Sequence, residues 1–303
     1  MELNTLLQYK PYSTARTEKR ALYAGLLTGL TQFHREHCPE YGRLLDALGC
    51  PAHMDCTVES TPMLPVSLFK ELELRSIPEG EVFKTITSSG TTGQRVSRIF
   101  LDGATSACQQ QALCQIMSDF LGERRLPFLV LDSRQVLRNR AMFSARGAGI
   151  LGFSIFGTRP CYALDEHMEL DLDGVRAFLE EHQGETIFLF GFTFIIWKHV
   201  VRALEERGER LDIPNGILVH GGGWKKLAGE AVSHGELMDR VAAATGVERV
   251  SNYYGMAEQT GCIYMECPQG HLHASLWSDI VVRRGRDYRP CEPGEEGVLQ
   301  VLS

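Results

Sequence analysis

The sequence predicts an α/β protein built on a parallel sheet, because two short apolar segments are each followed by a turn and then by a helical pattern, and a third predicted strand ends in a similar turn. These segments span 186–190, 216–220 and 247–252. A strand, a turn and a helix in that order form the βα unit of a parallel sheet. Ligands on such sheets bind beyond the carboxyl ends of the strands. We therefore expect the glycine and aromatic turns that follow the segments to meet at one ligand site. These turns lie at 191–193, 221–224 and 253–255.

The remaining patterns extend this fold at both ends. Apolar residues at helical spacing predict helices over 15–33, with Ser13 or Thr14 as the cap, and also over 41–48, 103–121 and 171–181. Short apolar runs predict strands at 128–131, 279–283 and 297–302. We expect a helical N-terminal part at 1–80, an α/β core at 81–270 and a β-rich end at 271–303.

Composition limits the class of protein. The chain has 303 residues, of which 44% are hydrophobic, enough for a large core in one or two domains. A net charge of −7 gives no electrostatic case for nucleic acid. No apolar run approaches the roughly 18 residues of a membrane span, and residues 1–10 do not resemble a secretory signal. The nine cysteines are interpreted as reduced thiols, which indicates a cytoplasmic location.

The segment Thr87-Ser88-Ser89-Gly90-Thr91-Thr92-Gly93-Gln94 is rich in groups that bind phosphate. Five of its eight residues carry hydroxyls and two are glycines. Consecutive backbone N–H groups in such a turn can surround an anion, and hydroxyls add further donors. Because Gln94 and Arg95 follow Gly93, the segment is not a Walker A loop, which ends in Gly-Lys-Ser/Thr. The alternative is an ordinary polar hairpin loop.

Two motifs in order give the segment a family context. Ser88-Ser89-Gly90-Thr91-Thr92-Gly93 resembles the phosphate loop of the adenylate-forming superfamily, and Tyr254-Gly255-Met256-Ala257-Glu258 resembles its Tyr-Gly-x-Thr-Glu signature. The segments 83–85, 220–226, 255–259 and 297–303 are similar to those of acyl-protein synthetases. That family includes the fatty-acid-activating component of bacterial bioluminescence reductases, and phenylacetate-CoA ligases are near relatives. The resemblance runs from about residue 9 to residue 303.

The resemblance implies an activity and a fold. The fold would be the large N-terminal domain of the superfamily, with parallel-sheet layers, flanking helices and a small β-rich part. A hinge and a small mobile domain with a catalytic lysine would follow Ser303, as would a nucleophilic cysteine of the acyl-protein synthetases. The activity would be ATP-dependent activation of a fatty or aromatic acid as an acyl-adenylate, then transfer to a thiol of CoA, a carrier protein or a reductase subunit. The alternative is a non-catalytic remnant that binds a nucleotide or a partner.

The same resemblance assigns roles to individual residues. The loop would hold the β- and γ-phosphates of ATP through Ser88, Ser89, Gly90, Thr91, Thr92 and Gly93, with Thr91 and Arg95 as catalytic groups. The nucleotide would also contact Gly222, Gly223, Trp224, Asn252, Tyr253, Tyr254, Gly255, Met256 and Ala257. Glu258 would bind Mg²⁺, a cation that takes few protein carboxylates. Ala257 stands where the family usually has threonine, which removes one hydroxyl contact to the α-phosphate. Alternatively, the glycines form a tight turn and Tyr254 is an ordinary half-buried tyrosine.

Two further groups of residues are candidates for binding. By analogy with related ligases, the acyl pocket would be lined by Phe143, Ile150, Phe153 and Phe192, although such residues also suit an ordinary core. Cys262, Cys267, His271 and His273 form a C-x4-C-x3-H-x-H pattern, and thiolate and imidazole are zinc ligands. The alternative is that the cysteines are buried apolar groups and that His273 belongs to a β-hairpin.

Overall fold

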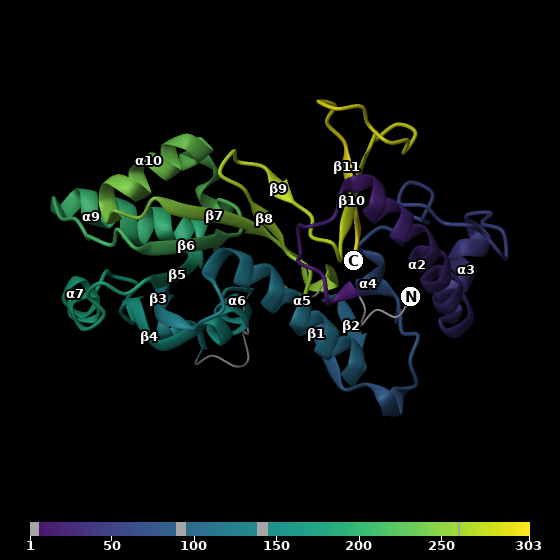
Figure 1. The fold of residues 1–303 in the computed structure, drawn as a ribbon, viewed down its shortest axis with the longest axis horizontal. Coiled ribbons are helices and arrows are strands. Elements are labelled where there is room, and N and C mark those ends of the chain that lie inside the picture. The colour runs from purple at the N-terminus through teal and green to yellow at the C-terminus, as the bar shows by residue number, and fades with distance from the viewer. Residues whose placement is uncertain (1–5, 89–94, 138–144, 260) are drawn as a thin grey trace. The chain divides into compact units, whose positions relative to one another are not determined.

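The computed structural model describes residues 6–88, 95–137, 145–259 and 261–303, which form two compact units (Figure 1). The first unit comprises residues 1–119, 255–264 and 274–303. The second unit comprises residues 120–254 and 265–273. The boundaries expected at 80/81 and 270/271 divide the chain by type of secondary structure, and they stay a prediction.

The second unit is built on a seven-stranded sheet with the order β4-β3-β5-β6-β7-β8-β9. The strands are β3 (Leu126–Ser133), β4 (Gly157–Leu164), β5 (Ile187–Phe192), β6 (Gly216–Gly221), β7 (Arg249–Tyr254), β8 (Tyr264–Glu266) and β9 (Leu272–His273). The pairs β4–β3, β3–β5, β5–β6 and β6–β7 are parallel, whereas β8 and β9 are antiparallel. The predicted α/β class and mainly parallel sheet are confirmed.

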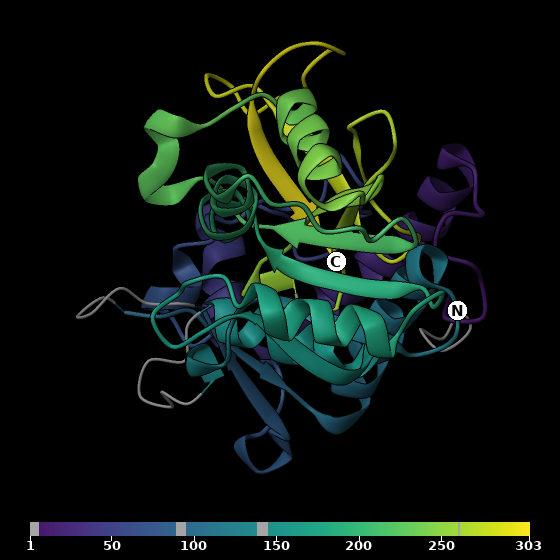
Figure 2. The same cartoon turned by 90° about the vertical axis from the view of Figure 1, so that its left-hand side faces the viewer.

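Helices cover both faces of this sheet, and Figure 2 shows α7 and α10 on opposite sides of the strands. The α-helices are α6 (Ala145–Phe153), α7 (Leu172–Glu181), α8 (Thr193–Ile195), α9 (Arg202–Arg207) and α10 (His234–Thr245). Between α8 and α9 lies the π-helix η5 (Ile196–Val201), and the 3-10 helices are η2 (Arg134–Leu137), η4 (Ser154–Phe156) and η6 (Lys225–Glu230). Asp171 and Ser233 cap α7 and α10 by accepting backbone N–H groups, as polar N-caps do.

Aromatic side chains fill the core between the sheet and α6. Phe128 of β3 and Phe188 of β5 are fully buried and stack with their ring centroids 4.8 Å apart. Phe190 of β5 stacks on Phe153 of α6 with the centroids 4.4 Å apart. Each such ring buries a large apolar area, and a stacked aromatic pair adds about 0.5 to 1.5 kcal/mol beyond that burial. The helix α6 is thereby fixed against the middle of the sheet.

The first unit contains helices and two antiparallel strand pairs. Its helices are α2 (Arg16–His37), α3 (Pro39–Ala47), α4 (Leu68–Glu71), α5 (Gly103–Leu121), η1 (Glu79–Glu81) and η7 (Ala257–Gln259). Its strand pairs are β1 (Lys84–Thr87) with β2 (Arg98–Leu101), and β10 (Asp279–Arg283) with β11 (Val298–Leu302). The expected cap of the first helix is wrong. Ala15 is the N-cap of α2 and makes no side-chain capping bond, so neither Ser13 nor Thr14 has that role.

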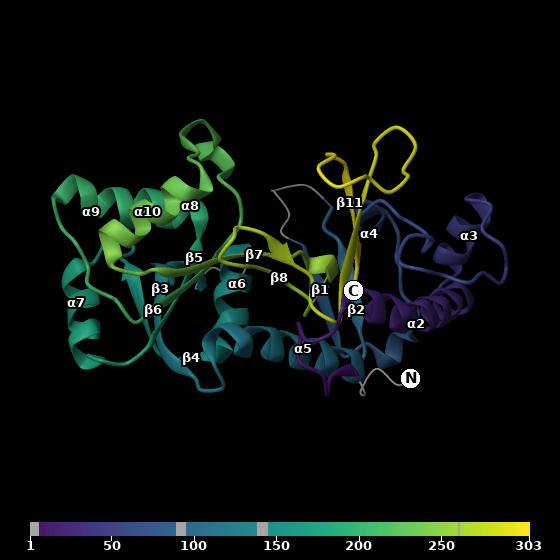
Figure 3. The ribbon, with the colours of Figure 1, turned by 45° about the horizontal axis from the view of Figure 1, so that its top comes forward.

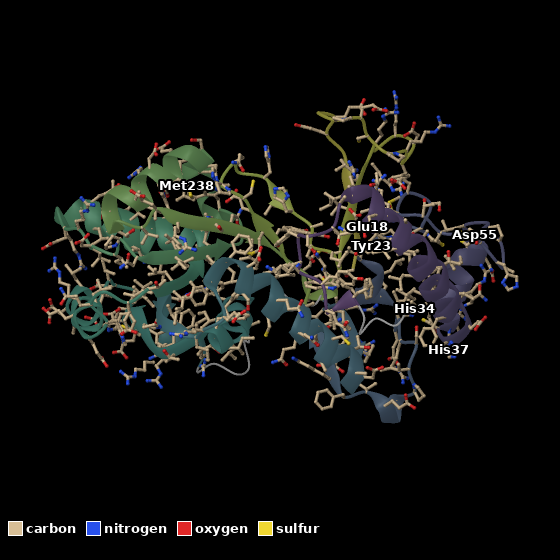
Figure 4. The ribbon with its side chains drawn as sticks, viewed as in Figure 1. Glu18, Tyr23, His34, His37, Asp55 and Met238 are labelled. Carbon is tan, nitrogen blue, oxygen red and sulfur yellow. The ribbon has the colours of Figure 1, made fainter. Side chains whose placement is uncertain are left out.

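The helix α2 packs on the β10–β11 ribbon, which Figure 3 shows with its connecting loops. Tyr23 of α2, labelled in Figure 4, shares a buried cluster with Val281 and Leu302 of the ribbon. Its hydroxyl donates to the Leu276 carbonyl over 2.8 Å. Lys19, one turn earlier, donates to the Ser278 carbonyl over 2.5 Å. Segments far apart in the sequence therefore form one core in this unit.

Charged groups reinforce the same contact. The ammonium of Lys19 lies 3.6 Å from the carboxylate of Asp279, and burial lowers the pKa of Lys19 although Asp279 opposes that effect. Arg283 of β10 is 7% exposed and donates to the side chain of Gln300 and to the carbonyls of Tyr288 and Glu59. A buried charge is costly unless it is paired or hydrogen-bonded. Lys19 is paired with Asp279, and Arg283 is held by hydrogen bonds to neutral acceptors.

Candidate active site

The carboxyl ends of β5, β6 and β7 lie side by side at one edge of the parallel sheet. The register pairs Phe192 with Gly221, and Gly221 with Tyr253. The turns at 191–193 and 221–224 are thereby neighbours, and Tyr253 and Tyr254 end the next strand. The edge brings together five residues with predicted nucleotide contacts and one with a predicted acyl contact. They are Gly222, Gly223, Asn252, Tyr253 and Tyr254, and Phe192.

An aromatic cluster forms the floor of this edge. The ring of Tyr253 lies 4.9 Å from Phe153 and 6.1 Å from Phe190, between centroids. Phe192 contacts Phe190 edge-on at 5.9 Å. Burial raises the pKa of Tyr253 to about 12, so its phenol stays neutral at physiological pH. Two of the residues predicted to line an acyl pocket, Phe153 and Phe192, therefore belong to the same cluster as a tyrosine predicted to bind the nucleotide.

The other two residues predicted to line the acyl pocket are Ile150 and Phe143. Ile150 of α6 is 1% exposed and is part of the core. Gly149, beside it, lets the ring of Phe192 approach, because a Cβ there would lie 3.0 Å from that ring. Phe143 lies outside the described residues. The helix α6 thus contributes one wall of the aromatic cluster, and the acyl role of these residues stays a prediction.

Two glycines at the exit of β6 are required by sterics. A Cβ on Gly221 would collide with the ring of Tyr253. Gly222 has φ of 75°, a backbone conformation that favours glycine, and a Cβ there would lie 2.9 Å from the ring of Phe192. Gly222 and Gly223 are both exposed. The turn therefore presents bare backbone to solvent beside an aromatic floor, a surface on which a flat nucleobase can lie.

A threonine and a histidine beneath this turn were not predicted to have a role. Thr193, the residue after β5, has its hydroxyl 2.9 Å from Nδ1 of His220, 2.8 Å from the Gly222 carbonyl and 3.2 Å from the Gly221 carbonyl. Both side chains are buried, at 5% and 3% exposure. Burial lowers the pKa of His220 to about 4. The sequence places these residues 27 positions apart, so only the pairing of β5 with β6 reveals their contact.

Trp224, at the end of the same turn, is held by aromatic contacts. Its ring meets that of Trp197 edge-on, with the centroids 5.4 Å apart. The guanidinium of Arg240 lies 4.2 Å over the Trp197 ring and is itself paired with Glu205, Nε to Oε1 at 2.8 Å. Trp197 belongs to the π-helix η5, an irregularity often found at functional sites. These contacts position the far end of the turn.

Glu266 fixes the strand that carries the tyrosines. One carboxylate oxygen of this buried residue accepts the backbone N–H of Asn252 over 2.9 Å. The other oxygen lies 3.4 Å from Nδ1 of His234, which is half exposed. The side chain of Glu266 therefore takes the place of a ladder partner for β7. Sequence reasoning missed Glu266, since no local pattern distinguishes it from a surface glutamate.

In the first unit the structure describes only the ends of the predicted phosphate loop. Ser88 accepts the Ser97 N–H on its hydroxyl over 2.9 Å and donates its own N–H to the Ser97 carbonyl. Arg95 forms an exposed ion pair with Glu71 at 2.8 Å. The predicted phosphate-binding residues Ser89, Gly90, Thr91, Thr92 and Gly93 lie outside the described residues. The described ends form a closed hairpin base below the loop.

The second signature motif ends in a short helix of the first unit. Gly255 and Met256 precede η7, in which Ala257 and Glu258 lie, and the Gln259 N–H closes the turn on the Met256 carbonyl. Glu258 is half-buried and forms no ion pair with any residue of 6–88, 95–137, 145–259 or 261–303. A carboxylate without a cationic partner fits one ligand of Mg²⁺, which usually takes one or two carboxylates and completes its shell with waters and phosphates.

The zinc site predicted at Cys262, Cys267, His271 and His273 is not supported. Among the described residues, no three His, Cys, Asp or Glu side chains are grouped so as to hold a metal ion. Burial raises the pKa of Cys262 to about 12, whereas zinc binds the thiolate. The thiol instead contacts the Trp277 carbonyl. His273 pairs with Met265 in the β8–β9 hairpin, as the alternative interpretation expected.

The sequence profile of the acyl-protein synthetase family, LuxE, matches residues 2–303. The chain belongs to the acyl-protein synthetase family. Family membership supports the predicted ATP-dependent activation of an acid followed by acyl transfer, the chemistry of an acyl-adenylate-forming ligase. Within the described part of this synthetase-family chain, no helix is long and apolar enough to cross a membrane.

Three proteins similar to this chain share 15% to 20% of its sequence. The long-chain-fatty-acid–luciferin-component ligase of Vibrio harveyi is 20% identical over 304 residues, which cover 96% of this chain and 77% of that protein. A 2-hydroxyisobutyryl-CoA ligase, solved in an open conformation with 2-HIB-AMP and CoA, has a TM-score of 0.64 at 15% identity. A long-chain-fatty-acid-CoA ligase from Archaeoglobus fulgidus has a TM-score of 0.48 at 15% identity, over 86% of this chain and 46% of that one.

The first of these structures gives the fold of the chain. The match covers 97% of this chain, which spans 65% of the length of the 2-hydroxyisobutyryl-CoA ligase. At 15% identity the likeness shows the fold alone. It confirms the predicted adenylate-forming ligase fold.

Proposed function

We propose that the chain activates a carboxylic acid with ATP, forms an acyl-adenylate and pyrophosphate, and passes the acyl group to a thiol. The observation that carries the proposal is the exit of β6. Gly221 and Gly222 have no side chain there, so the backbone lies directly beside the rings of Tyr253 and Phe192. A turn of this kind accepts a flat base, and it lies where ligands of parallel sheets bind. We place the adenine of ATP against Gly222 and Gly223.

The remaining nucleotide contacts follow from the motifs. Tyr254, which is 39% exposed, would stack on adenine, and the Asn252 side chain would contact its polar edge. Tyr253 and Trp224 would support these contacts from below and from the end of the turn. In the first unit, Ser88 and the loop at 89–93 would hold the phosphates through N–H and hydroxyl groups. We propose Thr91 as a catalytic hydroxyl and Arg95 as a cation that exchanges Glu71 for phosphate.

The reaction joins two anions. A carboxylate oxygen of the acid attacks the α-phosphorus of ATP, a new O–P bond forms, and the bond to the bridging oxygen breaks as pyrophosphate leaves with the electron pair. Catalysis consists mainly of positioning and of stabilising the charge that develops. Glu258 would hold Mg²⁺, which when bound neutralises phosphate charge. The protein residues orient the two reactants and exclude water from the aromatic edge.

We propose a long-chain fatty acid as the first substrate to test, because the Vibrio harveyi relative is named for such an acid. The aromatic cluster of Phe153 and Phe192 and the core residue Ile150 offer apolar surface suited to an acyl chain or an aromatic acid. The acceptor would be the thiol of CoA, of a carrier protein or of a reductase subunit. The nine free cysteines of the chain fit a reducing, cytoplasmic setting for this thiol chemistry.

The test is ATP–pyrophosphate exchange with wild type and with Glu258→Ala. Loss of the Mg²⁺ ligand should abolish exchange while leaving the thermal unfolding midpoint unchanged. The matched control is Glu18→Ala, since Glu18 is an exposed glutamate of the same unit (Figure 4). It should exchange at the wild-type rate. Equal exchange in Glu258→Ala and wild type would contradict the role of Glu258.

A further inference from the structure

We propose that Thr193 and His220 are positioning residues for the nucleobase. Together they hold the Gly222 carbonyl inward, so that the N–H of Gly223 faces outward as a hydrogen-bond donor to a ring nitrogen of the base. This inference rests on the proposed function, because it assumes that the turn at 221–223 receives the adenine of ATP. It goes beyond that function by naming the residues that set the turn and the atom that recognises the base.

Counting protons gives the direction of each hydrogen bond. The Thr193 hydroxyl has one proton but three neighbours within 3.2 Å, and two of these are carbonyls, which only accept. If the proton goes to the nearest carbonyl, that of Gly222 at 2.8 Å, then Nδ1 of His220 must donate to the hydroxyl oxygen. This arrangement makes two hydrogen bonds in a chain. The reverse arrangement, with the hydroxyl donating to Nδ1, makes one. We therefore assign the Nδ1–H tautomer to His220.

Peptide geometry carries the effect to the surface. In a trans peptide the C=O and the following N–H point in opposite directions. Because the Gly222 carbonyl faces the buried Thr193 hydroxyl, the N–H of Gly223 faces away from it. Among the described residues this N–H has no acceptor, and the space where a Cβ of Gly223 would stand is open to at least 4 Å. A base that presents its edge to Gly223 can therefore supply the acceptor, because the lone pairs of its ring nitrogens lie in the plane of the base.

The surroundings of His220 argue against a role in packing alone. Its other nitrogen, Nε2, is buried and has no partner among the residues that the structure describes. The side chains around the imidazole are mostly apolar and include Leu237, Met238 and Val241 of α10, with Met238 labelled in Figure 4. A buried polar atom without a partner costs free energy that an apolar residue would avoid. The hydrogen bond from Nδ1 to the Thr193 hydroxyl explains why this position holds a histidine rather than an apolar residue.

The test compares four variants in the exchange reaction and follows the Michaelis constants of ATP and pyrophosphate separately. Thr193→Val removes the hydroxyl at constant shape, and Thr193→Ser restores it. His220→Leu removes the Nδ1 donor, whereas His220→Asn keeps a donor near the Nδ1 position. The matched control is Thr245→Val, because Thr245 is 4% exposed in the same unit and its hydroxyl donates to the Val241 carbonyl within α10 rather than to a carbonyl of the turn.

We expect Thr193→Val and His220→Leu to raise the KM for ATP about tenfold, the size of one hydrogen bond's net contribution. The KM for pyrophosphate and kcat should change little, since the lost contact is to the base. Thr193→Ser, His220→Asn and Thr245→Val should keep the wild-type KM for ATP. Equal rises for ATP and pyrophosphate, or a similar KM for ATP in Thr193→Val and Thr245→Val, would overturn the inference.

A binding measurement separates this inference from the proposed function. Adenosine is titrated against the tryptophan fluorescence of wild type and Thr193→Val, because Trp224 ends the turn and only three tryptophans are present. If wild type shows no exchange with any acid, the proposed activity fails. The positioning role then stands if adenosine binds Thr193→Val about tenfold more weakly than wild type. It is overturned if the two proteins bind adenosine alike or if neither binds it.

Discussion

Two buried polar clusters in this chain are built from opposite kinds of group. Below the exit of β6, the neutral side chains of Thr193 and His220 bond each other, and Thr193 also bonds the Gly222 carbonyl. Between α2 and the β10–β11 ribbon, Lys19 and Arg283 are cations that bond carbonyls and, for Lys19, the carboxylate of Asp279. Removing an ion from a buried cluster leaves its partners uncompensated, whereas removing a neutral group costs less. At neutral pH, variants of the ionic cluster should therefore change mainly stability, and variants of the neutral cluster mainly ligand binding.

The largest effect is expected at Arg283. Arg283→Met removes donors from the Gln300 side chain and from two carbonyls. Each acceptor left without a donor costs about 1 to 3 kcal/mol, so the free energy of unfolding should fall by about 3 to 5 kcal/mol. Urea denaturation measures the change. The control is Arg286→Met, because the side chain of Arg286 is 79% exposed and its loss should cost at most about 0.5 kcal/mol. Equal stability of the two variants would contradict the claim that the ionic cluster contributes mainly to stability.

The next effect depends on pH and isolates His220. Its pKa is about 4 in the folded protein and near 6.5 when unfolded, so between these values the unfolded chain binds the extra proton. Stability is therefore present above pH 6.5 and is lost as pH falls toward 4, by about 3 kcal/mol from this residue. His220→Asn lacks this titration. Between pH 7 and pH 4 its free energy of unfolding should therefore fall by about 3 kcal/mol less than that of the wild type. Parallel stability curves for the two proteins would show that His220 is not buried as described.

The smallest effect is expected at Glu266, which combines a charge with the functional edge. Glu266→Gln keeps an oxygen to accept the Asn252 N–H and should lower the free energy of unfolding by about 1 kcal/mol or less. Glu266→Leu removes the acceptor and should cost about 2 kcal/mol. Thermal and urea unfolding of both variants checks the order. If Gln costs as much as Leu, then the negative charge near His234, rather than the acceptor, holds the strand.

The middle of the parallel sheet could be predicted because β3, β5 and β6 contain continuous apolar runs, and β5 and β6 end in turns with glycine or aromatic residues. The strand β4 was not predicted, and its residues explain why. It lies at the edge of the sheet, contains Pro160 and has Arg159 at φ of 47°, beside a shift in its register with β3. Proline and irregular backbone are tolerated on edge strands but obscure the period that identifies a strand.

The site was predictable only where chemistry is encoded locally. The glycines at 221–223 and the motif at 254–258 can be recognised in the sequence, and their exact contacts stay predictions. The roles of Thr193, His220 and Glu266 could not be predicted from the sequence. Their partners lie on or next to other strands, and only the register of the sheet brings these residues into contact. The zinc pattern failed for the converse reason, since its spacing suggested ligands but Cys262 is buried as a neutral thiol.

The most direct test of the central claim is ATP–pyrophosphate exchange by this chain with a panel of fatty and aromatic acids. The proposed function predicts exchange that requires both an added acid and Mg²⁺. The exchange should be fastest with one class of acid, and long-chain fatty acids are the first class to test. Adenosine binding without exchange for any acid would contradict it. The chain would then be a nucleotide-binding protein that does not form an adenylate.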